Sequence, residues 1–179
     1  MIRKALIYFF SITIFIGLSF TSCKHQEDID PEHGNVELYL LESYETIENT
    51  YFQIDETTVQ TFENPLLSYS DIISYNAKKY TFKLIEEAKD TIKNLNHRVN
   101  GLAFAVKANN EVVYTGYFWP GYSSISCAWV VIDPIMINED NEMIVRLGYP
   151  GPVQGMTIPD KRNDPQLLDI FRRDNKLIE

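Results

Sequence analysis

The chain has few cysteines and fewer basic than acidic residues. Two cysteines are too few for a disulfide framework, so a packed core must hold the fold together. The 16 lysines and arginines stand against 25 aspartates and glutamates, which gives a formal net charge of −9. A surface with this excess of acid repels phosphate backbones and anionic lipid headgroups. The composition therefore excludes nucleic acid from the expected partners.

Common catalytic and nucleotide-binding motifs are also missing. The sequence has no P-loop, no Gly-x-Gly-x-x-Gly run, no His-Glu-x-x-His pair and no Cys-x-x-Cys pair. The glycine-rich stretch LGYPGPVQGMTIPD at 147–160 contains no lysine, which is typical of an irregular loop rather than a phosphate cradle. His25 and His33 lie among acidic residues without the spacing of metal ligands. We therefore expect no metal and no cofactor.

The longest apolar run lies near the first residue. It begins after the positive pair Arg3-Lys4 and extends over residues 5–20. This length is short of the about 20 residues that a bilayer crossing needs and is typical of the apolar centre of a signal peptide. The run ends in SFTSC at 19–23, where small residues directly precede Cys23.

Residues 1–23 resemble the signal peptide and lipobox of bacterial lipoproteins, with Phe20 where leucine is usual in that family. The resemblance implies that the Cys23 thiol receives diacylglycerol and that residues 1–22 are then removed. It also implies a membrane anchor of acyl chains such as palmitate, at the bacterial outer membrane on either the periplasmic or the surface side. The alternatives are an ordinary secretory signal that is cut near Ser22 and an uncleaved anchor.

Loss of residues 1–22 removes two cations, so 14 basic residues remain against 25 acidic ones and the net charge becomes −11. Residues 23–35 are polar and acidic, contain a proline and a glycine, and show no apolar period. These features predict a flexible acidic tether. Residues 36–179 are long enough to bury a core of their own and are expected to form a single domain.

Hydrophobic patterns in this domain predict strands and two helices. The expected strands are Val36–Leu40, Tyr80–Leu84, a hairpin over 102–118 that turns at Asn109-Asn110, and the runs CAWVVID (127–133) and EMIVRLG (142–148). Apolar residues at helical spacing predict a helix over 85–95, and Asp164 followed by Pro165 predicts the start of another. We therefore expect an α+β fold, with two helices on one face of a mainly antiparallel sheet of about five strands.

Residues 65–118 resemble the first periplasmic domain of the SecD translocation subunit. The similar stretches are PLLSYSDI (65–72), YTFKLIEEAKDTI (80–92) and GLAFAVKANNEVVYTGYF (101–118). In that family a segment that opens with a similar DI leads to a strand, a helix and a hairpin. The resemblance implies a shared scaffold and not a role in translocation.

The stretch YTGYFWPGYSSISC at 114–127 is rich in aromatic residues and is interrupted by glycines and a proline. Aromatic side chains on such a loop give a large contact area for a sugar ring or for the apolar patch of a protein partner. Four of them are candidate ligand-binding residues: Tyr117, Phe118, Trp119 and Tyr122. The alternative is that they pack into the core.

A cysteine hydrolase is the second hypothesis, with Cys127 as nucleophile, His97 as base and Asp133 as the residue that orients the base. However, Cys127 alternates with Trp129 and Val131, which is typical of a buried strand, and His97 suits a helix C-terminus. The sequence therefore favours a non-catalytic, lipid-anchored binding or assembly module with a glycan or protein partner.

Overall fold

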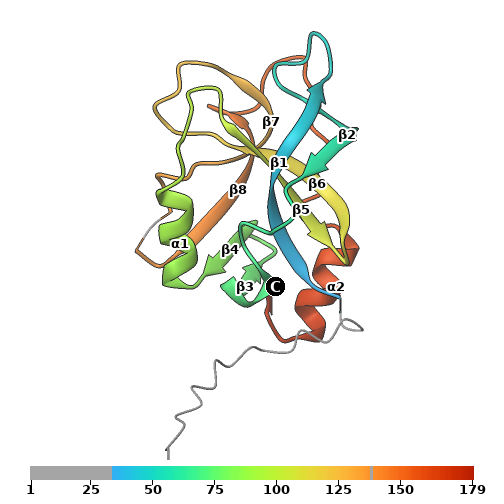
Figure 1. The fold of residues 1–179 in the computed structure, drawn as a ribbon, viewed down its shortest axis with the longest axis vertical. Helices are drawn as coiled ribbons and strands as arrows, with labels where there is room; N and C mark the ends of the chain where they lie inside the picture. The colour runs from blue at the N-terminus through green and yellow to red at the C-terminus, as the bar shows by residue number, and fades with distance from the viewer. Residues whose placement is uncertain (1–33, 138) are drawn as a thin grey trace, which may run out of the picture. The chain divides into compact units, whose positions relative to one another are not determined.

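Nine strands and two short helices make up the part of the chain that the computed structural model describes, residues 34–137 and 139–179 (Figure 1). In chain order the elements are β1 (Val36–Thr46), β2 (Ile54–Thr61), β3 (Ile72–Asn76), β4 (Thr81–Leu84), α1 (Glu86–Lys93), β5 (Leu102–Ala108), β6 (Glu111–Phe118), β7 (Cys127–Ile132), β8 (Glu142–Tyr149), α2 (Pro165–Arg173) and β9 (Leu177–Ile178). The predicted signal peptide, Cys23 and most of the predicted tether lie outside the described residues.

All nine strands belong to one sheet in the order β2-β1-β5-β6-β7-β8-β4-β3-β9. Neighbouring strands are antiparallel except for the parallel pairs β6–β7 and β3–β9. The sheet curls on itself, because Leu38 of β1 forms backbone hydrogen bonds with Leu67, shortly before β3. The prediction of an α+β fold with about five strands is therefore wrong: the described domain is mostly β.

The strands that were missed are short or irregular. β3 has five residues and β9 has two, which is too short for an alternating pattern to stand out. β2 has no regular alternation of buried and exposed residues, and its pairing with β1 shifts register twice, between Leu41 and Ser43 and again between Ser43 and Glu45. Such shifts interrupt the alternation of buried and exposed side chains. Tertiary pairing, rather than local pattern, thus sets the number of strands.

The central strands of the sheet bury side chains on both faces. Phe104 and Val106 of β5 point into a larger core, whereas Ala103 and Ala105 point into a smaller core on the other face. Every residue of β7 is buried for the same reason. Strands covered on both faces have continuous apolar sequences, which explains the run CAWVVI at 127–132.

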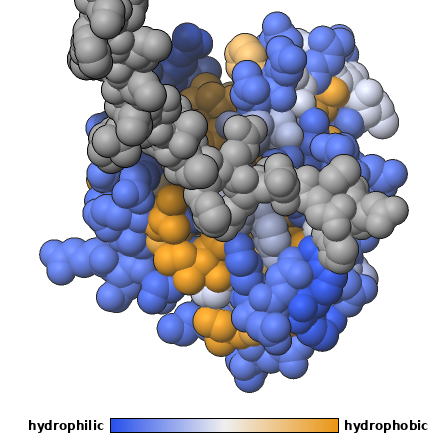
Figure 2. All heavy atoms as spheres, turned by 60° about the horizontal axis from the view of Figure 1, so that its bottom comes forward, coloured by the Kyte–Doolittle hydropathy of each residue, from blue (hydrophilic) through white to orange (hydrophobic). Residues whose placement is uncertain are grey.

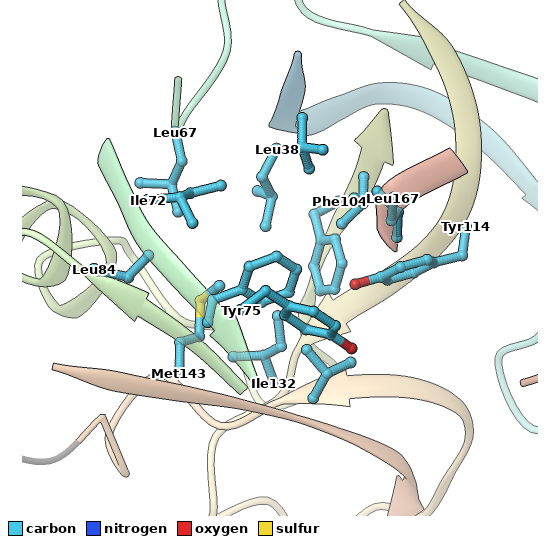
Figure 3. Close-up of a cluster of buried hydrophobic side chains, with 14 of the residues drawn as sticks. Leu38, Leu67, Ile72, Tyr75, Leu84, Phe104, Tyr114, Ile132, Met143 and Leu167 are labelled. Atoms are coloured by element: carbon cyan, nitrogen blue, oxygen red, sulfur yellow. The ribbon is translucent and has the colours of Figure 1, made fainter. Parts of the chain in front are cut away.

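The larger core lies inside the curl of the sheet, and Figure 3 shows part of it around Tyr75. Both helices contribute to it, α1 through Ile92 and α2 through Leu167 and Phe171. The Phe171 ring stacks on Tyr75 with 5.4 Å between ring centroids. The two helices thus complete the same core that the curled sheet begins.

Two local predictions are confirmed. The hairpin between β5 and β6 turns at Asn109 and Asn110, whose φ values are 53° and 65°. Asp164 caps α2, because its side chain accepts the backbone N–H of Gln166. The predicted end of α1 is wrong, since the helix stops at Lys93 and residues 94–101 form a loop.

Gly116 of β6 leaves no room for a side chain. A Cβ atom at this position would lie 2.6 Å from Cζ of Phe104 and 2.8 Å from the carbonyl oxygen of Val130. Because close-packed cores resist added atoms, we expect Gly116→Ala to lower the free energy of unfolding by about 1–3 kcal/mol in urea titrations. In the control Gly151→Ala the new atom meets nothing within 4 Å, and the change should stay within about 0.5 kcal/mol. Equal effects of the two variants would contradict the packing described here.

Candidate functional site

Trp119 follows β6 and is fully buried at one end of the sheet. Its backbone N–H donates to the carbonyl of Ile132 at 2.7 Å, which continues the pairing of β6 with β7. Its ring packs against Phe52, Tyr117 and Tyr149, with centroid distances of 5.1, 5.8 and 6.4 Å. The indole therefore lies at the centre of the smaller core.

Three loops meet at this indole and a fourth packs on the smaller core through Ile158; we call the four the distal loops. They comprise residues 47–53, 94–101, 119–126 and 150–158, and Figure 1 shows them at the end of the sheet opposite to the start of β1 and to α2. Gly101 brings the second loop against the ring, because a Cβ at Gly101 would lie 2.6 Å from Cε3 of Trp119. The φ of Gly101 is +79°, so both the backbone conformation and the close approach require glycine.

Hydrogen bonds hold the distal loops together. The Tyr149 hydroxyl donates to the carbonyl oxygens of Gly121 at 2.7 Å and Ser123 at 3.1 Å. The Ser123 hydroxyl donates to the carbonyl of Val99 at 2.6 Å. Nε2 of Gln53 in the first loop donates to the carbonyl of Thr157 in the fourth at 2.9 Å. These bonds join the loops in pairs that are far apart in the sequence, so the loops are preorganised rather than separate arms.

The four aromatic candidates divide between core and surface. Phe118 is buried in the larger core, while Tyr117 and Trp119 are buried in the smaller one. Tyr122 is 60% exposed, and its hydroxyl donates to the carbonyl of His97 at 3.3 Å. Of these four, Tyr122 is the residue that a ligand can touch in this conformation. A binding role for the whole segment stays a prediction.

The described residues do not link Cys127, His97 and Asp133 into a triad. Neither ring nitrogen of His97 has a hydrogen-bond partner. The Asp133 carboxylate instead accepts the backbone N–H of Ile135 at 3.0 Å and lies 4.0 Å from the guanidinium of Arg146. Asp133 thus stabilises the turn after β7 rather than orienting a base.

The thiol of Cys127 is fully buried in the smaller core. Burial raises its pKa to about 12, because the thiolate would lose its hydration, and a hydrogen bond from the Trp129 backbone offsets this only in part. A cysteine nucleophile instead needs a lowered pKa and access to its substrate. The environment of Cys127 is that of a structural thiol.

This environment predicts slow alkylation of the folded protein. In a chain that carries Cys23→Ser, we expect Cys127 to resist iodoacetamide at about pH 8 and to react readily once urea unfolds the domain, because the thiolate is the reactive species. The rate in the folded state should still rise with pH above about pH 9, since the pKa lies higher. Fast labelling that levels off near neutral pH would instead show an activated thiol.

A partly buried polar network, which was not predicted from the sequence, lies where β6 and β7 separate. β7 pairs with β6 at two positions, Tyr117 and Phe118, so β6 lacks this partner at Thr115. Glu56 of β2 accepts the backbone N–H of Thr115 at 2.9 Å, and its other oxygen accepts from Nζ of Lys161 at 2.6 Å. The network joins β2 and the segment after β8 to Thr115 of β6.

Removal of the Glu56 carboxylate should therefore lower the free energy of unfolding more than removal of the Lys161 ammonium group. Glu56→Ala leaves the N–H of Thr115 unpaired, so we expect the free energy of unfolding to fall by about 1–3 kcal/mol. Lys161 is partly exposed, and Lys161→Ala should cost less than about 1 kcal/mol. Chemical denaturation measures both changes. A larger loss of stability in Lys161→Ala would show that the ion pair stabilises the fold more than the hydrogen bond to the Thr115 backbone.

Comparisons with known proteins returned no match: no protein-family model fits the chain, and no curated protein or solved structure is similar to it. Within residues 34–137 and 139–179, no helix has the length and apolar character to cross a bilayer. In the same residues, no three side chains of His, Cys, Asp or Glu are grouped to hold a metal ion.

Proposed function

We propose that the chain is a lipid-anchored lipoprotein of the bacterial outer membrane that acts as a non-catalytic binding or assembly module. The pattern of residues 1–23 carries this proposal, because a positive start, an apolar run and small residues before Cys23 occur together. Two or more acyl chains anchor a protein stably, whereas one holds it only marginally. The anchor would keep the folded domain at the membrane surface.

Two properties of the described domain support binding over catalysis. The Cys127 thiol is buried and its pKa is raised to about 12, so it is neutral at physiological pH. The distal loops are held in place by the Trp119 ring and by hydrogen bonds between loops. Rigid loops on a sheet lose little conformational entropy when a partner binds, which favours recognition.

The charge of the protein supports recognition through shape and apolar contact. A net charge of −11 would remain after residues 1–22 are lost, which disfavours anionic partners. Figure 2 shows a view turned toward the lower end of Figure 1, where hydrophilic residues surround several apolar areas. A binding module of this kind needs a contact surface that is poor in charge.

The two cysteines allow a matched test of the anchor. We expect Cys23→Ser to abolish labelling by an alkyne fatty acid fed to the cells and to remove the acyl groups from the intact mass, because the thiol is the acyl acceptor. Cys127→Ser makes the same atomic change at the buried cysteine and should leave labelling and mass of the anchor unchanged. A wild-type chain that is extracted from membranes with a free thiol at residue 23 would refute the proposed function.

A further inference from the structure

Large apolar side chains are exposed on three of the distal loops. The exposed fractions are 47% for Ile47 and 56% for Tyr51 on the first loop, 54% for Val99 on the second, and 60% for Tyr122 on the third. Scattered apolar residues are normal on a protein surface, but a group of them marks an interaction site. Hydrogen bonds join the second and third loops, and the first loop lies beside them because Phe52 packs on the same Trp119 ring as Gly101.

The distal loops are also nearly free of charge. Glu48 and Arg98 are the two residues of the types Asp, Glu, Lys and Arg in 47–53, 94–101, 119–126 and 150–158, which also contain His97, whereas these four types make up 23% of the whole chain. Depletion of charge together with exposed tyrosine and aliphatic residues is typical of the centre of a protein interface. Tyrosine, serine, glycine and asparagine, all present in these loops, are also the residues that antibody loops use for contact.

The backbone of the first distal loop has an unfavourable conformation at Tyr51, whose side chain is exposed. The φ values of Tyr51 and Phe52 are 42° and 74°, which bulky residues rarely adopt. The Phe52 ring packs on Trp119 and the Tyr51 carbonyl accepts the N–H of Ala128 at 2.8 Å, so the loop cannot relax freely. The Phe52 side chain is thereby fixed toward the smaller core, and the Tyr51 side chain is fixed toward solvent. Backbone strain of this kind concentrates at functional sites.

We propose that the distal loops form the docking surface for a protein partner that presents an uncharged patch with an apolar centre. The inference rests on the proposed function and names the partner class for that binding module. A patch with little charge is the complement of these loops, because Glu48 and Arg98 are outnumbered by exposed apolar side chains and uncharged polar residues. Tyr51, Val99 and Tyr122 supply the central contacts.

The place where the chain enters the domain favours a protein over the membrane as the occupant. The carbonyl of Gly34 accepts from Nη2 of Arg173 in α2 at 2.6 Å, at the end of the sheet opposite to the distal loops (Figure 1). Residues 23–33 reach at most about 40 Å when fully extended. A lipid at Cys23 would thus be joined to the domain at the end away from these loops, through a segment of at most this length. The loops also lack the cluster of basic residues that anionic lipids attract.

Photocrosslinking of the full-length chain in living bacterial cells tests this surface. A benzophenone amino acid replaces Val99 or Tyr122, and Ile73 of β3, which is 46% exposed at the other end of the sheet, serves as the control position. We expect one discrete adduct with a different protein from positions 99 and 122 and none from position 73. Adducts with lipid or with a second copy of the chain, equal adducts from position 73, or no adduct at all would overturn the proposal.

Tyr51→Asn, introduced into the same chains, separates contact from stability. Asparagine accepts positive φ more readily than tyrosine, so the melting temperature should stay the same or rise. The adduct at position 122 should nevertheless fall at least about tenfold, since a central tyrosine contact is lost. Phe52→Asn is the comparison, because it removes the contact with Trp119 and should lower the melting temperature. An adduct that survives Tyr51→Asn would overturn the proposal.

The mass of the N-terminal peptide that contains residue 23, measured on protein from the same cells, tests the proposed function separately. An unmodified Cys23 together with an intact adduct would refute the anchor and leave the docking surface standing. A modified Cys23 without an adduct would refute the surface alone.

Discussion

The burial of one indole ring is the contact on which the distal half of the domain depends. Trp119 touches Phe52, Gly101 and Tyr149, so three segments far apart in the sequence pack on the same side chain as the loop that carries it. A tryptophan in such a position contributes about 3–5 kcal/mol. The same contacts that stabilise the smaller core therefore also fix the shape of the proposed docking surface.

The two faces of the central strands pack on two separate cores that support different parts of the domain. The larger core holds both helices and the curl of the sheet, and it supplies most of the buried apolar residues. The smaller core combines aromatic, aliphatic and small residues around Trp119 and supports the distal loops. The polar network of Glu56 and Thr115 adds to the smaller core, because it joins β2 to β6 where β7 no longer pairs with β6, and the Thr115 hydroxyl accepts from Nε1 of Trp129. Loops on such a scaffold can be shaped for recognition without loss of the main core.

Local features of the fold could be predicted from the sequence, whereas long-range ones could not. The asparagine turn after β5 and the cap at Asp164 depend on neighbouring residues and are readable as patterns. The nine-stranded sheet depends on pairings such as Leu38 with Leu67, which no local period encodes. At the site, the sequence identified the aromatic stretch 114–127 as a candidate but did not predict which of its rings are buried and which are exposed. Tyr51 was missed, and the lack of charge in the surrounding loops is the signal that could have found it.

Hydrogen exchange in a Trp119→Leu variant tests most directly whether the indole organises the distal loops. The N–H groups of Gly101, Ser123 and Ala128 each donate to a loop carbonyl, and they belong to different segments. If Trp119 is the common support, all three should exchange faster together, while the N–H of Tyr75, which donates to Lys176 near α2, stays protected. Faster exchange at Ser123 alone, or an equal change at Tyr75, would contradict this account.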